Sequence, residues 1–304
     1  MICVSYAATN EVTFNETLHE ARIFFSPIYK KHGKELTIIG DWSYDENNAK
    51  AMAYTTNHFF IEVYGGALKA KGTNKDSLRA MICHEVGHHI GGAPYVPRYY
   101  EDYYLFRGSS EGQADYYAAQ RCLKNWFSGE NHWRELEKYR FSEKDKKFCT
   151  KYEEGQENIG LCLRVITAFK RMLQINIDES VSFQYKARNP NYQYALASSV
   201  THPSKECRLE TVYAGVICNA EKKAGCLSFE NPIEASRPLC WAGLGFLLKY
   251  EYPVIGAKII DFIIGLDIQH FKKDPYDDDE VFEESHEIIK QYGDIIPALS
   301  NYPN

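Results

Sequence analysis

The 304-residue sequence lacks several features that would mark whole classes of protein. It has no run of about 18 uncharged apolar residues, because the longest apolar segment, residues 239–266, contains four charged residues. The sequence therefore predicts no membrane span. It also lacks a basic surplus, since 35 Lys and Arg stand against 41 Asp and Glu. Such a chain has little positive charge with which to neutralise phosphates, so we expect no nucleic-acid partner.

No Cys-x-x-Cys pair occurs, although the chain contains nine cysteines. We therefore expect no second, cysteine-built zinc site. Two interpretations of the cysteines stay open: scattered buried thiols, or disulfides in an exported protein. We favour the second, and expect at least two disulfides among the later cysteines, which are Cys149, Cys162, Cys207, Cys218, Cys226 and Cys240.

The N-terminus also lacks a signal peptide, since Met1-Ile2-Cys3 opens neither a basic segment nor an apolar run. The chain is thus either cytosolic or a mature form numbered after cleavage. Its cysteine content favours an exported location, periplasmic or extracellular, over a cytoplasmic one. The sequence leaves the oligomeric state open.

Hydrophobic periodicity and turn residues predict short strands first and helices afterwards. We expect strands at residues 36–39 and 57–64, and a tyrosine-rich connection at 95–108. The predicted helices cover residues 16–32, 77–90, 111–127, 131–139, 142–152, 157–176 and 203–220. This order predicts an α+β fold with a small sheet and a mostly helical C-terminal part. We expect one domain at residues 1–235 and a helical extension packed on it at residues 236–304.

The segment His84-Glu85-Val86-Gly87-His88 has the pattern HExxH and lies on a predicted helix. Residues four apart lie on one face of a helix, so His84 and His88 can bind one metal ion. Glu85 then lies beside the ion, where it can act as general base towards a zinc-bound water. We expect Cys83 to remain a free buried thiol, because it lies within this helix.

A catalytic zinc needs a third protein ligand and an open fourth position. Glu111 opens the next predicted helix, and Asp115 lies one turn further on the same face. Glu111 can therefore act as the third ligand, while Asp115 can accept a hydrogen bond from the second ring nitrogen of a ligand histidine.

HExxH followed by Glu-x-x-Ala-Asp resembles the gluzincin family of zinc peptidases that includes the HtpX-type, CAAX prenyl and BepA-type proteases. Three further blocks resemble that family in the same order: Asn48-Ala49-x-Ala51, Gly66-Ala67-Leu68, and Thr201-His202-Pro203 with Arg208. Residues 125–194 match no block of the family. The resemblance implies a zincin-like fold, a single Zn²⁺ and an endopeptidase activity. The membrane-embedded members of the family carry transmembrane helices around these blocks, whereas this sequence predicts none.

The resemblance also implies roles for individual residues. Asp115 would brace His84, and Arg208 would support the acidic group behind the ligands. His202 would be a catalytic-site residue that either steadies the oxyanion or occupies the fourth metal position. The substrate, a protein or peptide, would lie extended along an edge strand. We assign that edge to the strand at 57–64, with Phe59, Ile61 and Val63 on one face.

The sequence therefore predicts a zinc-dependent endopeptidase in which Glu85 activates a zinc-bound water. A second class of function stays open, namely a catalytically silent zinc-binding protein that serves as a chaperone-like or scaffold module. The presence of Glu85 favours the enzyme, because a purely structural site needs no general base. A fourth position closed by His202 would favour the silent protein.

Overall fold

The computed structural model describes residues 6–100, 103–179, 202–221, 226, 233–238 and 240–242, with the backbone alone for residues 6–9, 97–100 and 103–107. The chain divides into two compact units, Met1–Ser182 with Val200–Arg237, and Phe183–Ser199 with Pro238–Asn304. Nearly all described residues belong to the first unit, which is the subject of the following paragraphs. Residues 183–200 and most of the expected extension from 236 lie outside the described residues.

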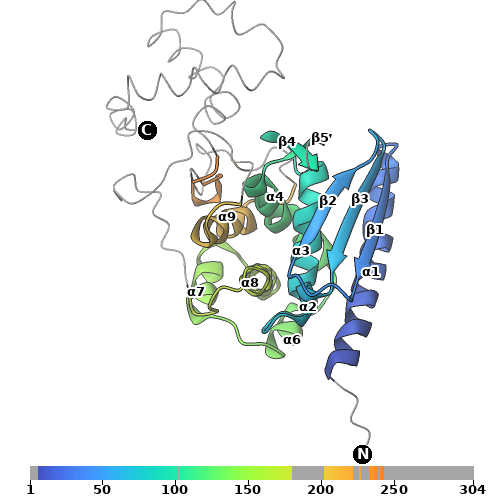
Figure 1. The fold of residues 1–304 in the computed structure, drawn as a ribbon. Coiled ribbons are helices and arrows are strands. Elements are labelled where there is room, and N and C mark those ends of the chain that lie inside the picture. Colours follow the sequence, from blue (N-terminus) through green and yellow to red (C-terminus); the bar gives the residue numbers. More distant parts are fainter. Residues whose placement is uncertain are drawn as a thin grey trace, which may run out of the picture. The chain divides into compact units, whose positions relative to one another are not determined.

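A small three-stranded sheet forms the N-terminal part of the first unit (Figure 1). It follows the long helix α1 (Tyr6–Lys31) and contains β1 (Glu35–Asp41), β2 (Ala49–Ala53) and β3 (His58–Tyr64). The strand order is β1-β3-β2, with β1 parallel and β2 antiparallel to β3. Helix α1 packs against β1 and contacts α3 (Lys75–Ile90), which packs against β2 and β3. The two helices thus cover the same face of the sheet.

The position of β3 corrects the prediction about substrate binding. Each residue of β3 pairs with β1, and most also pair with β2, so this strand is central and has no free edge. Phe59, Ile61 and Val63 do share one face, as predicted, but all three side chains are buried in the core under the helices. Within the described residues the outer strands of this sheet are β1 and β2, and β2 was not predicted as a strand.

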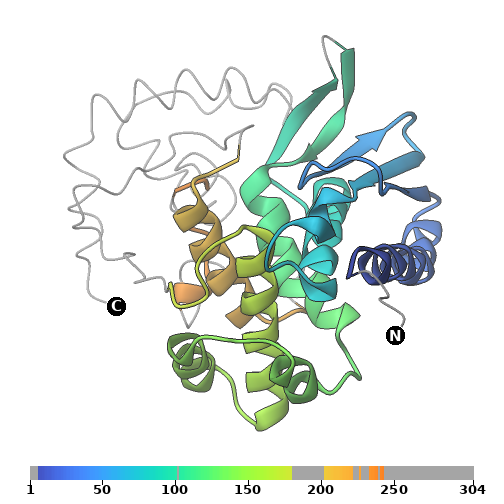
Figure 2. The same ribbon diagram turned by 60° about the horizontal axis from the view of Figure 1, so that its bottom comes forward.

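Most helices lie close to their predicted positions, although α1 begins at Tyr6 rather than at residue 16. After the short α2 (Gly66–Lys69) and α3 comes a hairpin of β4 (Tyr95–Tyr100) and β5 (Tyr103–Ser109), where only a connection was expected. Figure 2 shows this hairpin extending away from the helices. The next helix runs through α4 (Glu111–Tyr117), the π-helical turn η1 (Ala118–Cys122) and α5 (Leu123–Trp126). The remaining elements are α6 (His132–Glu137), α7 (Glu143–Tyr152), α8 (Gln156–Met172), α9 (Lys205–Ile217) and η2 (Ile233–Ala235). The fold is therefore α+β with a small sheet, as predicted.

None of the helices in the described part of the chain is long and apolar enough to cross a membrane.

Disulfides cross-link the helical part of the unit. Cys149–Cys162 and Cys218–Cys226 confirm the prediction of at least two bridges among the later cysteines, and Cys207 and Cys240 are also disulfide-bonded. Cys83, however, forms a disulfide with Cys122, so the prediction of a free thiol there is wrong. A helical position does not prevent pairing when a second helix passes alongside, as η1 does here. This set of bridges suggests an oxidising environment.

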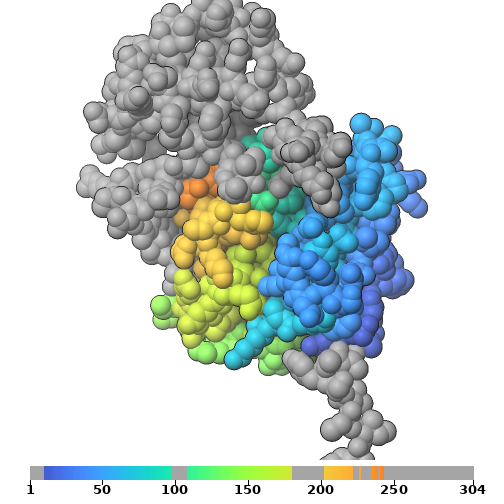
Figure 3. All heavy atoms as spheres, in the orientation of Figure 1, coloured from blue at the N-terminus to red at the C-terminus, as the bar shows by residue number. Residues whose placement is uncertain are grey.

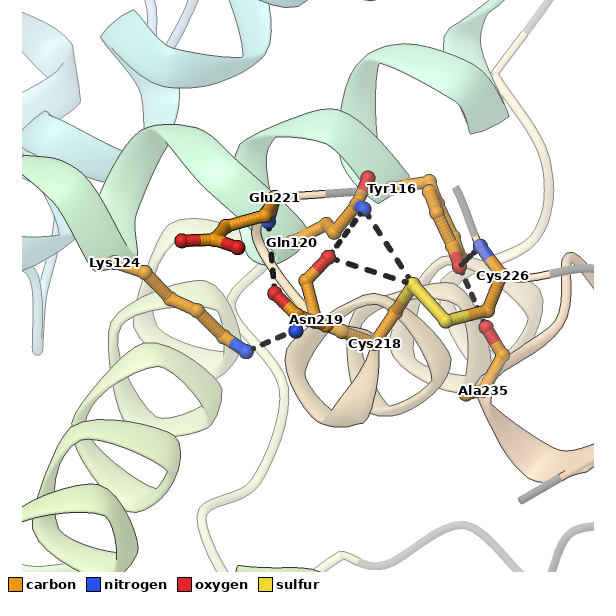
Figure 4. Close-up of a disulfide and its surroundings, with 8 residues drawn as sticks. All are labelled: Tyr116, Gln120, Lys124, Cys218, Asn219, Glu221, Cys226 and Ala235. Atoms are coloured by element: carbon orange, nitrogen blue, oxygen red, sulfur yellow. Dashed lines mark hydrogen bonds between the residues drawn. A yellow bond between two sulfur atoms is a disulfide. The ribbon is translucent and has the colours of Figure 1, made fainter. Parts of the chain in front are cut away.

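The Cys218–Cys226 bridge is held against the helix that continues from α4 (Figure 4). The Tyr116 hydroxyl accepts a hydrogen bond from the Cys226 amide (3.1 Å) and donates one to the Ala235 carbonyl (2.6 Å). One and two turns further along this helix, Gln120 donates to the Asn219 carbonyl (2.9 Å) and Lys124 to the Cys218 carbonyl (3.0 Å). These bonds anchor the helix that begins with Glu111.

Candidate metal centre

Helix α3 presents His84 and His88 on one face, one turn apart. Its start is set by a capping box in which the Asn74 side chain accepts from the Ser77 amide, and the Ser77 hydroxyl accepts from the Asn74 amide. The helix ends at Gly91, whose carbonyl accepts a hydrogen bond from the Gln113 side chain (2.7 Å). Both ends of the histidine-bearing helix are therefore fixed by side chains.

Gly87, between the two histidines, allows α4 to approach α3 closely. A Cβ atom at this position would lie 2.8 Å from both the Cα and the carbonyl oxygen of Ala114. Helix α4 begins at Ser110, whose side chain accepts from the Gln113 amide, so Glu111 is its first residue. The close approach therefore brings Glu111 against the two histidines.

The three predicted ligands converge. The Nε2 atoms of His84 and His88 lie 3.1 Å apart, and Oε2 of Glu111 lies 3.1 Å from the first and 3.4 Å from the second. A tetrahedral ion with bonds of about 2.0–2.1 Å separates its ligand atoms by about 3.3–3.4 Å. The observed separations match that spacing to within about 0.3 Å. These three buried residues are thus positioned to hold one metal ion.

Hydrogen bonds behind the histidines determine which ring nitrogen faces the centre. Nδ1 of His84 lies 2.7 Å from Oδ1 of Asp115, which is the predicted contact, and Nδ1 of His88 lies 2.9 Å from the Ser109 carbonyl. A carboxylate and a carbonyl only accept hydrogen bonds, so each Nδ1 carries the proton. Each Nε2 then faces the metal position.

Arg208 neutralises the carboxylate behind His84. It donates from Nε to Oδ2 of Asp115 (2.7 Å) and from a terminal nitrogen to Oδ1 (2.8 Å), a bidentate contact. Asp115 is fully buried, so the guanidinium offsets the cost of placing a carboxylate there. Arg208 therefore lies where the sequence analysis expected it.

Burial and neighbouring charges set the protonation of the groups at the centre. Burial alone would raise the pKa of the Glu111 carboxyl, but His88 and His84 hold that pKa well below its usual range. Burial likewise opposes ionisation of Asp115, but Arg208 and His84 keep its pKa low. For His84, burial would lower the pKa, but Asp115 and Glu111 outweigh it and raise the pKa to about 9. Without an ion, the site thus holds two ionised carboxylates and a protonated His84, and a bound metal ion would replace the Nε2 proton of His84.

The remaining predicted residues, Glu85 and His202, adjoin the same centre. Nε2 of His202 lies 3.2 Å from Oε2 of Glu111, and its ring lies nearly parallel to that of His84, with centroids 6.1 Å apart. Glu85 is 6% exposed and lines a cavity of about 390 Å³ together with His84, His202 and Arg208. Phe59, Ile61 and Val63 are absent from the lining of this cavity.

Several residues of the site were not identified from the sequence. Gly87 stands inside the HExxH segment, but its contact with Ala114 depends on how the helices pack. The Ser109 carbonyl carries no side-chain signal at all. The cavity wall formed by Met172, Leu173 and Gln174 comes from a region without any resemblance to the family blocks.

Comparison of the chain with models of known protein families found no matching family, and searches of curated proteins and of solved structures found no match.

Proposed function

We propose that this chain is a zinc-dependent endopeptidase with a zincin-like, gluzincin-type site. The observation that carries the proposal is the convergence of His84, His88 and Glu111 on one point beside a cavity that Glu85 lines. Two imidazoles and one carboxylate are the ligand set of many catalytic zinc sites, whereas structural zinc sites are built mostly from cysteine. The mature protein would act in an oxidising, exported location, which is supported by its disulfides.

His84, His88 and Glu111 would hold the zinc ion, which when bound supplies Lewis acidity and lowers the pKa of a water molecule to about 7. Glu85 takes the proton from the attacking water and delivers it to the leaving amine. His202 donates a hydrogen bond to the developing oxyanion. Asp115 and the Ser109 carbonyl keep the two ligand imidazoles in the required tautomer and orientation.

The substrate would pair with β2 rather than with β3. Within the described sheet, β2 has a neighbouring strand on one side only. Asn47, Asn48 and Ala49, at the start of this strand, line the cavity that also contains Glu85. An extended peptide added at this edge would gain main-chain hydrogen bonds that do not depend on its sequence. Such binding suits cleavage of unfolded segments.

The alternative is a catalytically silent zinc-binding protein of the chaperone-like or scaffold kind. The short distance from His202 to Glu111 favours it, because His202 could close the fourth metal position. The location of Glu85 in the cavity wall favours the enzyme, because a general base needs access to the reacting water.

Cleavage of unfolded casein by the wild type, Glu85→Gln and Glu62→Gln separates the two functions. Glu62 is the matched control, since it lies on β3 and does not line the cavity. We expect Glu85→Gln to bind zinc like the wild type but to lose cleavage, while Glu62→Gln retains both. Zinc content is measured by elemental mass spectrometry. Equal cleavage by Glu85→Gln and the wild type would refute the mechanism, and zinc binding without any wild-type cleavage would favour the silent protein.

A further inference from the structure

The C-terminal end of α8 forms an apolar wall of the cavity beside the candidate base. Met172, Leu173 and Gln174 line the cavity from this side, and Met81 lines it from α3. In the space-filling view, yellow-green and yellow atoms of the later helices face blue atoms of the early strands (Figure 3). The cavity is thus bounded by the edge of β2 on one side and by α8 and α9 on the other.

Met81 lies four residues before Glu85 and therefore on the same face of α3. Met81, Met172 and Leu173 are 8%, 7% and 7% exposed, so the small remaining surface of each belongs to a recess rather than to the outer surface. Helix α8 packs directly against α3, which fixes this wall relative to Glu85. Three apolar side chains therefore line the cavity that the candidate base also lines.

Polar groups occupy the rest of the recess without competing for its apolar part. Arg208 is committed to Asp115 through both of its contacts. The side-chain amide of Gln174 donates a hydrogen bond to the Arg171 carbonyl (2.8 Å). Gln174 itself has a left-handed backbone (φ 54°) and follows the end of α8. Lys205 is exposed at the start of α9. The Met81–Met172–Leu173 wall is therefore the part of the recess suited to an apolar group.

We propose that Met81, Met172 and Leu173 form a specificity pocket for a large apolar side chain next to the scissile peptide bond. This inference rests on the proposed peptidase function and adds the substrate class to it. Leu, Met and Phe are the expected side chains, because burial of apolar surface stabilises the complex roughly in proportion to area. Two of the three wall residues are methionines, whose flexible side chains adapt to ligands of different shape. The pocket therefore selects for size and apolarity rather than for one residue.

The strength of the preference for a large apolar side chain follows from the number of methylene groups that the pocket buries. Each methylene buried in a hydrophobic pocket favours binding by about 4-fold, and Leu has three more carbons than Ala. We expect kcat/KM for a peptide with Leu at the selected position to exceed that of its Ala counterpart by about 10–100-fold. A peptide with Asp or Lys there should be a poorer substrate still, since its charge would be desolvated against methionine and leucine.

The test uses a peptide series that varies one residue at a time on each side of the cleaved bond, with Ala, Leu, Phe, Asp and Lys. The full-length wild type is compared with Met172→Glu and with Leu136→Ala. Leu136 is the matched control, because it is buried on α6 but does not line the cavity. We expect Met172→Glu to lower the Leu-to-Lys ratio of kcat/KM at least 10-fold, and Leu136→Ala to leave that ratio unchanged. Circular dichroism checks that both variants are folded.

Binding to the Glu85→Gln variant provides a readout that does not require turnover. Fluorescence anisotropy with the same labelled peptides should give tighter binding for Leu and Phe than for Ala or Asp, and Met172→Glu in this background should remove the difference. Wild-type cleavage without a preference for Leu or Phe on either side would overturn the pocket but leave the peptidase intact. A preference unaffected by Met172→Glu would also overturn it. Absence of wild-type cleavage, with the binding preference retained, would overturn the peptidase but leave the pocket.

Discussion

Replacement of Gly87 by alanine should damage the metal centre through helix packing, without touching a ligand. The added Cβ would lie 2.8 Å from the Ala114 Cα and carbonyl oxygen, and 3.1 Å from the Ala114 Cβ. Carbon atoms in contact prefer separations of about 3.5–4.0 Å, so α4 must retreat by about 0.7–1.2 Å. Glu111 begins this helix and would move with it.

That displacement can be compared with the tolerance of a metal site. Ligand distances hold to within about 0.2 Å, so a shift several times larger separates Glu111 from His84 and His88. We expect zinc affinity to fall about 10–100-fold, similar to the loss of a group that orients a ligand. Overpacking costs about 1–3 kcal/mol, which the higher helix propensity of alanine offsets by about 0.5–1 kcal/mol. The free energy of unfolding of the metal-free protein should therefore fall by at most about 2.5 kcal/mol.

The assay is zinc titration in competition with a chromophoric chelator, together with urea unfolding of the metal-free protein. Gly215→Ala is the matched control, because its added Cβ would lie 2.8 Å from the Tyr116 carbonyl, at the contact of α9 with α4. This control should lose comparable stability but retain most of its zinc affinity. Unchanged zinc affinity in Gly87→Ala would refute the reasoning, as would an equal loss in both variants.

Four further predictions concern other parts of the structure. Asp115→Ala should weaken zinc affinity about 10–100-fold in the same titration, because His84 loses its orienting acceptor, and wild-type affinity would contradict that role. If His202 steadies the oxyanion, His202→Ala should lower kcat for casein peptides about 10²–10³-fold. If His202 is a fourth metal ligand, the same substitution should raise activity. Unchanged activity would exclude both roles. Peptide mapping without reductant should recover Cys83–Cys122, Cys149–Cys162 and Cys218–Cys226, and a free Cys83 would contradict the packing of α3 against η1. Glu20→Gln should destabilise the protein at neutral pH and have no effect in acid. Burial opposes ionisation of Glu20, but Lys75 and Arg79 outweigh it and lower the pKa of this carboxyl below the usual 4.5. The stability that ionised Glu20 contributes is therefore fully present above pH 4.5 and is lost as the pH falls through the lowered pKa. Urea unfolding at several pH values measures this difference, and a pH-independent effect would contradict it.

The sequence by itself determined the parts of the site that depend on local spacing. Two histidines four residues apart on a helix must share a face, and the positions of Glu111 and Asp115 one turn apart follow from the same periodicity. The helix from Glu111 begins where it was predicted, and α3 begins two residues before its predicted start. These features are local, so they could be predicted before the packing of the elements was known.

Only the tertiary structure decided which elements lie side by side. The sequence Ala-Lys-Ala-Met-Ala of β2 has little β-branched or aromatic content, so its role as the edge strand follows from pairing with β3, not from propensity. The Cys83–Cys122 bridge and the contact of Gly87 with Ala114 likewise depend on helices that meet although the paired residues lie far apart in the chain. The apolar wall at Met172 depends on α8 packing against α3. Such contacts are set by the burial of shared apolar surface between distant segments, and no local pattern of residues specifies them.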